Sequence, residues 1–143
     1  MLFTVCKILH VLGNVLWIGG GAASAFAFVL LAHEDEKVRL AGARALRTLT
    51  LTLVTPGFLL SISAGLIMLL TFWSEQYAKA PWMHVKLTLG IVAAAFSGVL
   101  SGRLRRAAAG SEVSPGSIRL AGSILLLSGI VNVVMVYTRL GQH

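Results

Sequence analysis

Charged side chains are scarce in this sequence, and acidic ones are the rarest. Asp, Glu, Lys and Arg together make up 12% of the 143 residues, whereas a soluble domain usually carries about 25%. Hydrophobic residues account for 57% of the chain, and the mean hydropathy is +0.86. This composition excludes a disordered chain and argues against a soluble globular fold.

Cysteine is nearly absent, and the usual polar catalytic motifs are missing. The single cysteine, Cys6, excludes an internal disulfide and any cysteine-rich metal framework. The sequence has no Ser/His/Asp arrangement, no glycine-rich phosphate loop and no paired carboxylates, so hydrolase and nucleotide-binding functions have no support. Twelve Lys and Arg against five Asp and Glu give a net charge of +7. Most of these basic residues stand at the ends of apolar runs, so we predict a lipid bilayer and no nucleic acid as the partner.

Long runs without charge predict four membrane-spanning helices, because one span needs about 20 mostly apolar residues. The expected spans are residues 8–32, 48–74, 82–102 and 120–138. Their short connections make consecutive helices antiparallel neighbours. The expected fold is therefore an all-α, integral membrane four-helix antiparallel bundle, in which residues 1–143 form a single membrane domain.

The basic residues are divided unequally between the two ends of this bundle. Segments 33–47 and 103–119 hold eight of the twelve, and the opposite end holds the other four. The positive-inside rule predicts a multi-pass protein of the inner or plasma membrane. Segments 33–47 and 103–119 would lie in the cytoplasm, and both termini outside, on the periplasmic side. We interpret residues 33–39 as a solvated connector, with a short interfacial helix as the alternative.

Three ionisable side chains lie within the apolar runs, where such groups are costly and mark functional sites. His10 lies in the first span, and His84 and Lys86 lie at the start of the third. Both spans run inward from the same side, so the topology predicts all three at similar depth. His84 and Lys86 are two positions apart and point roughly 200° apart on a helix. One of them should face the site, and the other should lie at an interface or around the site.

Small and polar residues share the helical face that carries His10. They follow at helical spacing and are Gly13, Asn14, Trp17, Gly20, Gly21 and Ser24. Small residues allow a neighbouring helix or a flat macrocycle to approach the backbone. In the fourth span, Asn132 is expected at the same depth. We therefore add Gly13, Trp17 and Asn132 to the candidate site around His10.

Three functional readings fit these residue types. A neutral imidazole is the commonest protein ligand for haem iron and copper, so His10 suits a haem b with Lys86 as second ligand or propionate partner. Copper is an alternative, because methionine thioethers and histidines bind it; the residues at this end are His10, His84, Met68, Met83 and Met135. A cofactor-free assembly subunit is the third reading.

Three segments resemble the HemJ-type protoporphyrinogen IX oxidases and the related CopD-like membrane proteins. His10, followed by Trp17 and then Gly19-Gly20-Gly21, is similar to the first helix of that family. The run Trp82-Met83-His84-Val85-Lys86 is similar to its Trp-Leu-His-x-Lys entry to the third helix. Thr55-Pro56 followed by Gly65 resembles its second helix. The resemblance covers roughly residues 7–106.

The resemblance implies a haem b held through His10 and Lys86 in an electron-transfer protein. It also implies an oxidoreductase of porphyrin biosynthesis, with a porphyrinogen as substrate and a quinone or another membrane carrier as electron acceptor. The family often has a Tyr-His pair where this sequence has Phe96-Ser97. That departure concerns the oxidase activity more than haem binding. The small-residue spacing Gly98-x-x-x-Gly102 is also compatible with a homo-oligomer.

Overall fold

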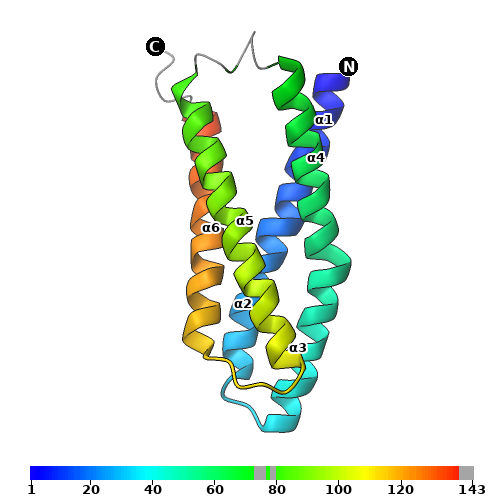
Figure 1. Ribbon diagram of the computed structural model, residues 1–143, viewed down its shortest axis with the longest axis vertical. Helices are drawn as coiled ribbons and strands as arrows, with labels where there is room; N and C mark the ends of the chain where they lie inside the picture. Colours follow the sequence, from blue (N-terminus) through cyan, green and yellow to red (C-terminus); the bar gives the residue numbers. More distant parts are fainter. Residues whose placement is uncertain (73–76, 78–79, 139–143) are drawn as a thin grey trace.

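The computed structural model describes residues 1–72, 77 and 80–138, and their regular elements are all helical. Two long rods each contain a π-helical segment: α1 (Leu2–Asn14), η1 (Val15–Gly19) and α2 (Gly20–Leu31) form the first, and α3 (Glu36–Leu49), η2 (Thr50–Val54) and α4 (Thr55–Phe72) the second. The other two rods are α5 (Pro81–Ala108) and α6 (Pro115–Thr138). All four are long and apolar enough to cross a membrane. The rods alternate in direction (Figure 1), so the antiparallel four-helix membrane bundle is confirmed.

The second rod begins earlier than the sequence pattern predicted, because segment 33–47 is helical from Glu36 onward. Asp35 stands at the N-cap and Glu36 in the first turn, where negative charge stabilises a helix. The Ala, Leu and Arg residues that follow have high helix propensity. Ala43, only 1% exposed, packs into the main hydrophobic core. Residues 33–39 are all exposed, as expected of a solvated connector, but from Glu36 onward they are helical. At this end of the bundle only residues 32–35 and 109–114 lie outside helices.

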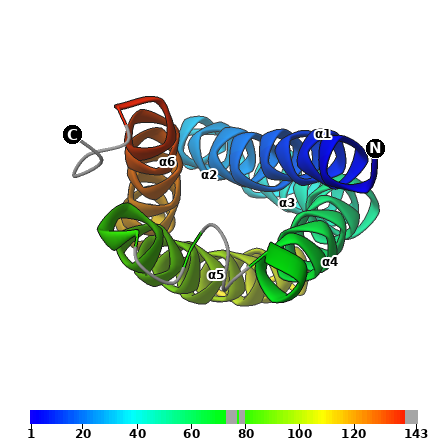
Figure 2. The ribbon, with the colours of Figure 1, turned by 90° about the horizontal axis from the view of Figure 1, so that it is seen from above.

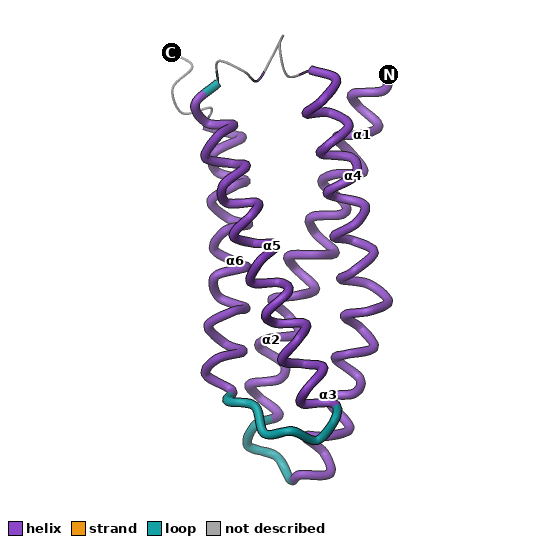
Figure 3. Tube along the Cα trace, in the orientation of Figure 1, coloured by secondary structure: helices purple, strands orange, loops and turns teal. Residues whose placement is uncertain are grey.

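The rods pack as two pairs that diverge towards the end where α1 begins and α6 ends, which we call the proximal end. Along the pairs, α1 packs on α4 and α5 on α6. The pairs are joined mainly by contacts of α2 with α6 and of α3 with α5, in the opposite, distal half. Seen from above, the rods form an elongated ring (Figure 2), and the tube view shows α5 and α6 standing apart from α1 and α4 near the proximal end (Figure 3).

Glycines allow the first pair of helices to touch backbone to backbone. A Cβ on Gly13 would lie 2.5 Å from the Ser61 nitrogen and 2.7 Å from the Gly57 oxygen. A Cβ on Gly57 would lie 2.7 Å from the Leu16 Cβ. No side chain fits between backbones at these distances, so the two glycines fix the register of α1 on α4.

Proline explains the π-helical segment of the second rod. Pro56 has no N–H, and its ring crowds the carbonyl four residues earlier, at Thr52. The helix widens just before it, and threonine hydroxyls bind carbonyls along this stretch. Thr55 Oγ1 donates to the Thr50 oxygen at 3.0 Å, and Thr52 Oγ1 donates to the Thr48 oxygen at 2.9 Å. The Thr-Pro-Gly sequence is thus accommodated without a break in the helix.

Candidate functional site

A closed hydrogen-bond network joins His10 to the second rod. The Nδ1 of His10 lies 2.8 Å from the backbone oxygen of Ser61, and its Nε2 lies 3.1 Å from Nδ2 of Asn14. The Ser61 hydroxyl donates to Oδ1 of Asn14 at 2.9 Å and also lies 3.2 Å from His10 Nδ1. Ser61 is fully buried and His10 partly so. The network therefore holds the imidazole in one orientation against α4.

The Ser61 carbonyl determines which ring nitrogen of His10 carries the proton. A carbonyl oxygen only accepts hydrogen bonds, so Nδ1 is the donor and a neutral ring has its lone pair on Nε2. The Asn14 amide donates to that lone pair. Metal-bound histidines usually donate their second N–H to a carbonyl or carboxylate, which fixes tautomer and orientation. His10 has this arrangement, with Nε2 as the atom able to bind a metal.

Gly65 supplies the space that the imidazole occupies. A Cβ at this position would lie 2.9 Å from His10 Nδ1 and 3.0 Å from its Cε1. The ring therefore lies where a side chain of α4 would otherwise be. Glycine at residue 65 and the carbonyl of Ser61, one turn away, together form the seat for His10.

Lys86 lies on the inward face of α5, and His84 lies on the outward face. The inward face follows a seven-residue pattern whose members are all buried or half-buried: Met83, Lys86, Gly90, Ala93, Ser97, Leu100 and Leu104. His84 is exposed, as are its neighbours Val85 and Thr88. The structure thus brings Lys86, and not His84, to the side of α5 that faces His10.

Two contacts fix the level of α5 relative to α1. Near the proximal end, Phe3 packs against the cluster that contains Met83. Further in, the Trp17 indole N–H donates to Ser97 Oγ at 2.9 Å, joining residues 80 positions apart. The two helices run in the same direction, so the offset of the Trp17–Ser97 bond applies to the residues around it. His10 is therefore level with residue 90, and Lys86 lies one turn nearer the proximal end.

Two further features lie near the level of His10: unfilled space beside α5 and a buried polar atom on α6. A Cβ on Gly90 would meet no atom within 4 Å, although Gly90 belongs to the inward face of α5. On α6, Oδ1 of Asn132 is buried and has no hydrogen-bond partner among the described residues. A Cβ on Gly129 would lie 2.7 Å from Ile18, and α6 runs opposite to α1. Asn132, about one turn further along, is therefore level with Asn14.

A crevice of about 180 Å³ lies on the distal side of this level, between the second rod and α5. Hydroxyl-bearing and small residues line most of it: Thr50, Val54, Thr55, Phe58, Ala94, Ser97, Gly98 and Ser101. Trp17 is buried and contacts two of these residues, through its bond to Ser97 and an edge-on contact with Phe58 at 4.9 Å. The indole therefore separates the crevice from the His10 level.

Most of the site residues expected from the sequence occupy one half of the bundle. On the first rod and on the inward faces of α5 and α6 lie His10, Gly13, Trp17, Lys86 and Asn132. His84 is the exception: it is exposed, and its Nδ1 lies 3.2 Å from the Ala80 oxygen. Sequence reasoning missed Ser61, whose contribution is largely a backbone carbonyl and gives no signal in a sequence pattern.

The structure bears on only some of the ligands named for copper. The described residues contain no group of three or more His, Cys, Asp or Glu placed to hold a metal ion. Met83 is buried in a cluster with Tyr77 and Ala80, and His84 lies on the outward face of α5. Copper stays an alternative prediction that would rest on His10, Met68 and Met135.

The Trp17–Ser97 bond provides a test of how the two helix pairs are joined. Ser97→Ala leaves the buried indole N–H without an acceptor, which should lower the free energy of unfolding by about 1–3 kcal/mol. Ser101→Ala is the matched control, because Ser101 lies one turn away on the same helix and makes no hydrogen bond to a described residue. Unfolding in mixed micelles would measure both variants. Equal losses would contradict a specific role for Ser97.

No family model, curated protein or solved structure matches this chain. Composition and fold therefore establish its class, a multi-pass α-helical membrane protein with four membrane-crossing helices. Within that class, its activity must be argued from the residues around His10.

Proposed function

We propose that this protein is a membrane redox protein that binds haem b through Nε2 of His10. The observation that carries the proposal is the 2.8 Å contact of His10 Nδ1 with the Ser61 carbonyl, because it leaves Nε2 as the ligating nitrogen. Bound haem would supply one-electron transfer within the membrane. The resemblance to HemJ-type proteins, at His10 and at the Trp82–Lys86 element, adds independent support.

The residues around His10 fit a planar, anionic macrocycle. Gly90 leaves open space on the inward face of α5, at the level of His10. Lys86 lies on the same face, one turn away, where its amine suits either the second axial position or a propionate. The unpartnered Oδ1 of Asn132 offers a further acceptor at this depth. Each of the four rods thus contributes to one binding region.

The chain's own groups would orient and protect this region. The Ser61 carbonyl and the Asn14 amide fix the imidazole, so that ligand binding needs only the displacement of one amide N–H from Nε2. Trp17 closes the distal side. Towards the proximal end, Phe3, Phe72 and Trp82 pack against the cluster of Tyr77, Ala80 and Met83. These apolar side chains would limit the access of water. A water-poor site favours stable redox chemistry, since it limits side reactions.

The proposal extends to substrate and orientation on the strength of the sequence. A porphyrinogen would give its electrons to the site, and a quinone or another membrane carrier would accept them. Both termini would lie on the periplasmic side, with segments 33–47 and 103–119 in the cytoplasm. The arginines of these segments would then lie on the side that the positive-inside rule assigns to them.

An absorption spectrum tests the proposal directly. Protein purified in mild detergent from haem-replete cells should show a Soret band, and reduction by dithionite should reveal b-type α and β bands. A pyridine haemochrome assay would give the amount of haem per chain. Folded, monodisperse protein with no haem absorbance would contradict the proposal.

A further inference from the structure

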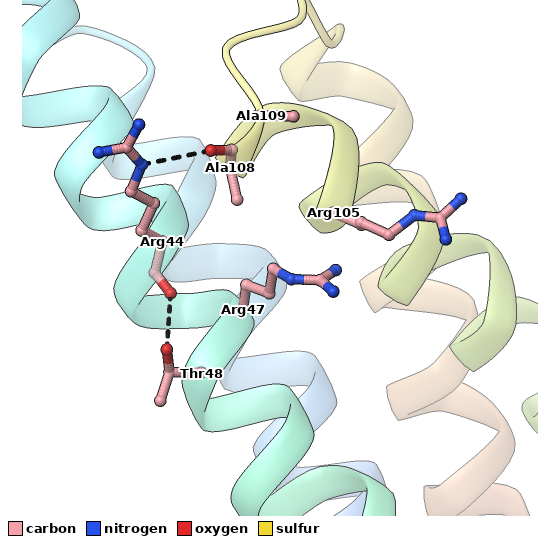
Figure 4. A pocket seen from close by; sticks show the side chains of 6 residues that line it. All are labelled: Arg44, Arg47, Thr48, Arg105, Ala108 and Ala109. Carbon is pink, nitrogen blue, oxygen red and sulfur yellow. Dashed lines mark hydrogen bonds between the residues drawn. The ribbon is translucent and has the colours of Figure 1, made fainter.

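A second polar site lies at the distal end of the bundle, far along the rods from His10. It is a shallow pocket of about 450 Å³ between α3 and α5 (Figure 4). Six residues line it, and we call it the arginine pocket: Arg44, Arg47, Thr48, Arg105, Ala108 and Ala109. Arg44 and Arg47 extend from α3 and Arg105 from α5, so two different membrane spans contribute the cationic groups.

The charges of this pocket are not neutralised by the protein. No acidic side chain lines it. Arg44 Nε donates to the backbone oxygen of Ala108 at 3.3 Å, which satisfies a carbonyl at the end of α5. The guanidinium groups of Arg47 and Arg105 make no hydrogen bond or ion pair with any described residue. Figure 4 shows the Arg47 side chain between those of Arg44 and Arg105, which point away from each other. Like charges that line one pocket without an acidic partner repel one another, so an anion bound there would be stabilised.

The depth of the pocket places it at the membrane surface. In the second rod, the charge-free stretch begins immediately after Arg47, and in α5 the corresponding stretch ends at Arg103. Arg47 and Arg105 therefore lie where the hydrocarbon core gives way to the headgroup layer. Beyond Thr48, Leu49 and Leu51 are 38% and 50% exposed, so an apolar surface continues from the pocket along the rod.

We propose that the arginine pocket binds the phosphate group of an anionic phospholipid whose acyl chains lie against the exposed leucines of the second rod. A guanidinium presents a planar fork of N–H donors that matches phosphate oxygens, so Arg47 and Arg105 suit this ligand. The negative end of the α5 dipole opposes an anion, but Arg44 binds the last carbonyls and offsets that effect. The bound lipid would connect the second and third spans.

Binding of a fluorescent-chain phosphatidylglycerol to the purified full chain in detergent tests this proposal. Phosphatidylcholine with the same label is the comparison, because it carries the same phosphodiester without net charge. We expect saturable binding with about ten-fold preference for phosphatidylglycerol. Arg47→Gln together with Arg105→Gln should abolish the preference. Arg47→Lys with Arg105→Lys should retain part of it, since charge remains while the fork is lost.

The matched control removes the same number of charges from the same two segments but outside the pocket. Arg39→Gln with Arg103→Gln should keep the preference, and circular dichroism would verify that each variant is folded. Equal loss in both pairs of variants, or no preference in the native chain, would overturn the proposal. Displacement of the lipid by inorganic phosphate, beyond that caused by chloride at equal ionic strength, would overturn the lipid assignment in favour of a free phosphate.

Discussion

His10→Ala should remove the b-type absorbance bands from the purified protein, whereas His84→Ala should leave them unchanged. Both substitutions delete one imidazole near the same end of the bundle. His10 is seated against α4 with its Nε2 lone pair available, and His84 is exposed on the outward face of α5. The measurement is the haem content per chain, from the pyridine haemochrome assay, with secondary structure checked by circular dichroism.

The expected loss of haem in each variant follows from what the substituted group does at the site. Removal of a hydrogen-bond partner of a metal-bound histidine costs roughly 10- to 100-fold in affinity, and removal of the ligand itself should cost more. Asn14→Leu should affect haem content less than His10→Ala, because the Asn14 amide bonds Nε2 only until the metal displaces it. Exogenous imidazole should restore the bands in His10→Gly, where the deleted ring leaves space. Full haem content in His10→Ala would show that another side chain holds the iron.

The four spans could be predicted because a bilayer imposes a length and a polarity that any spanning helix must meet. The helix ends could not be predicted in the same way. The second rod continues into α3, where Arg44 and Arg47 lie on a helix that packs on α5 through Ala43. A charge-based boundary stops at the first arginine, whereas the hydrogen-bonded helix continues into the headgroup layer.

The choice between His84 and Lys86 shows what helical periodicity can decide. Their separation places them on different faces, but it does not say which face is inward. The seven-residue spacing of Met83, Gly90 and Ser97 marks the inward face in the structure, and Lys86 belongs to it. That spacing is present in the sequence, although each of its members is unremarkable alone.

Contacts between helices could not be predicted from the sequence pattern, for a different reason. The seat of His10 depends on a main-chain carbonyl at Ser61, and every residue has a carbonyl. The bond from Trp17 to Ser97 depends on the relative level of two helices that are distant in the chain. Such registers are set by close approach at positions such as Gly13, and only the packed structure reveals them.

Gly13→Ala should destabilise the protein, although the same substitution at Gly98 should stabilise it. In a helix interior alanine is favoured over glycine by about 1 kcal/mol, and a Cβ on Gly98 would meet no atom within 4 Å. A Cβ on Gly13 would lie 2.5 Å from the Ser61 nitrogen and 2.8 Å from the Ser61 Cα. Because these are backbone atoms, α1 and α4 must separate, and overpacking of this kind costs about 1–3 kcal/mol or more.

The two substitutions should change the free energy of unfolding in opposite directions. Comparing them therefore tests the site as well as the fold. Separation of α1 from α4 at Gly13 would lengthen the contact of His10 with the Ser61 carbonyl, because both depend on the same register. Gly13→Ala should therefore lower both the free energy of unfolding and the haem content, and Gly98→Ala should lower neither. Unfolding in mixed micelles and the haemochrome assay measure the two quantities separately. A stable Gly13→Ala variant that retains full haem would mean that α1 and α4 do not pack through these glycines, and the seat of His10 would have to be sought elsewhere.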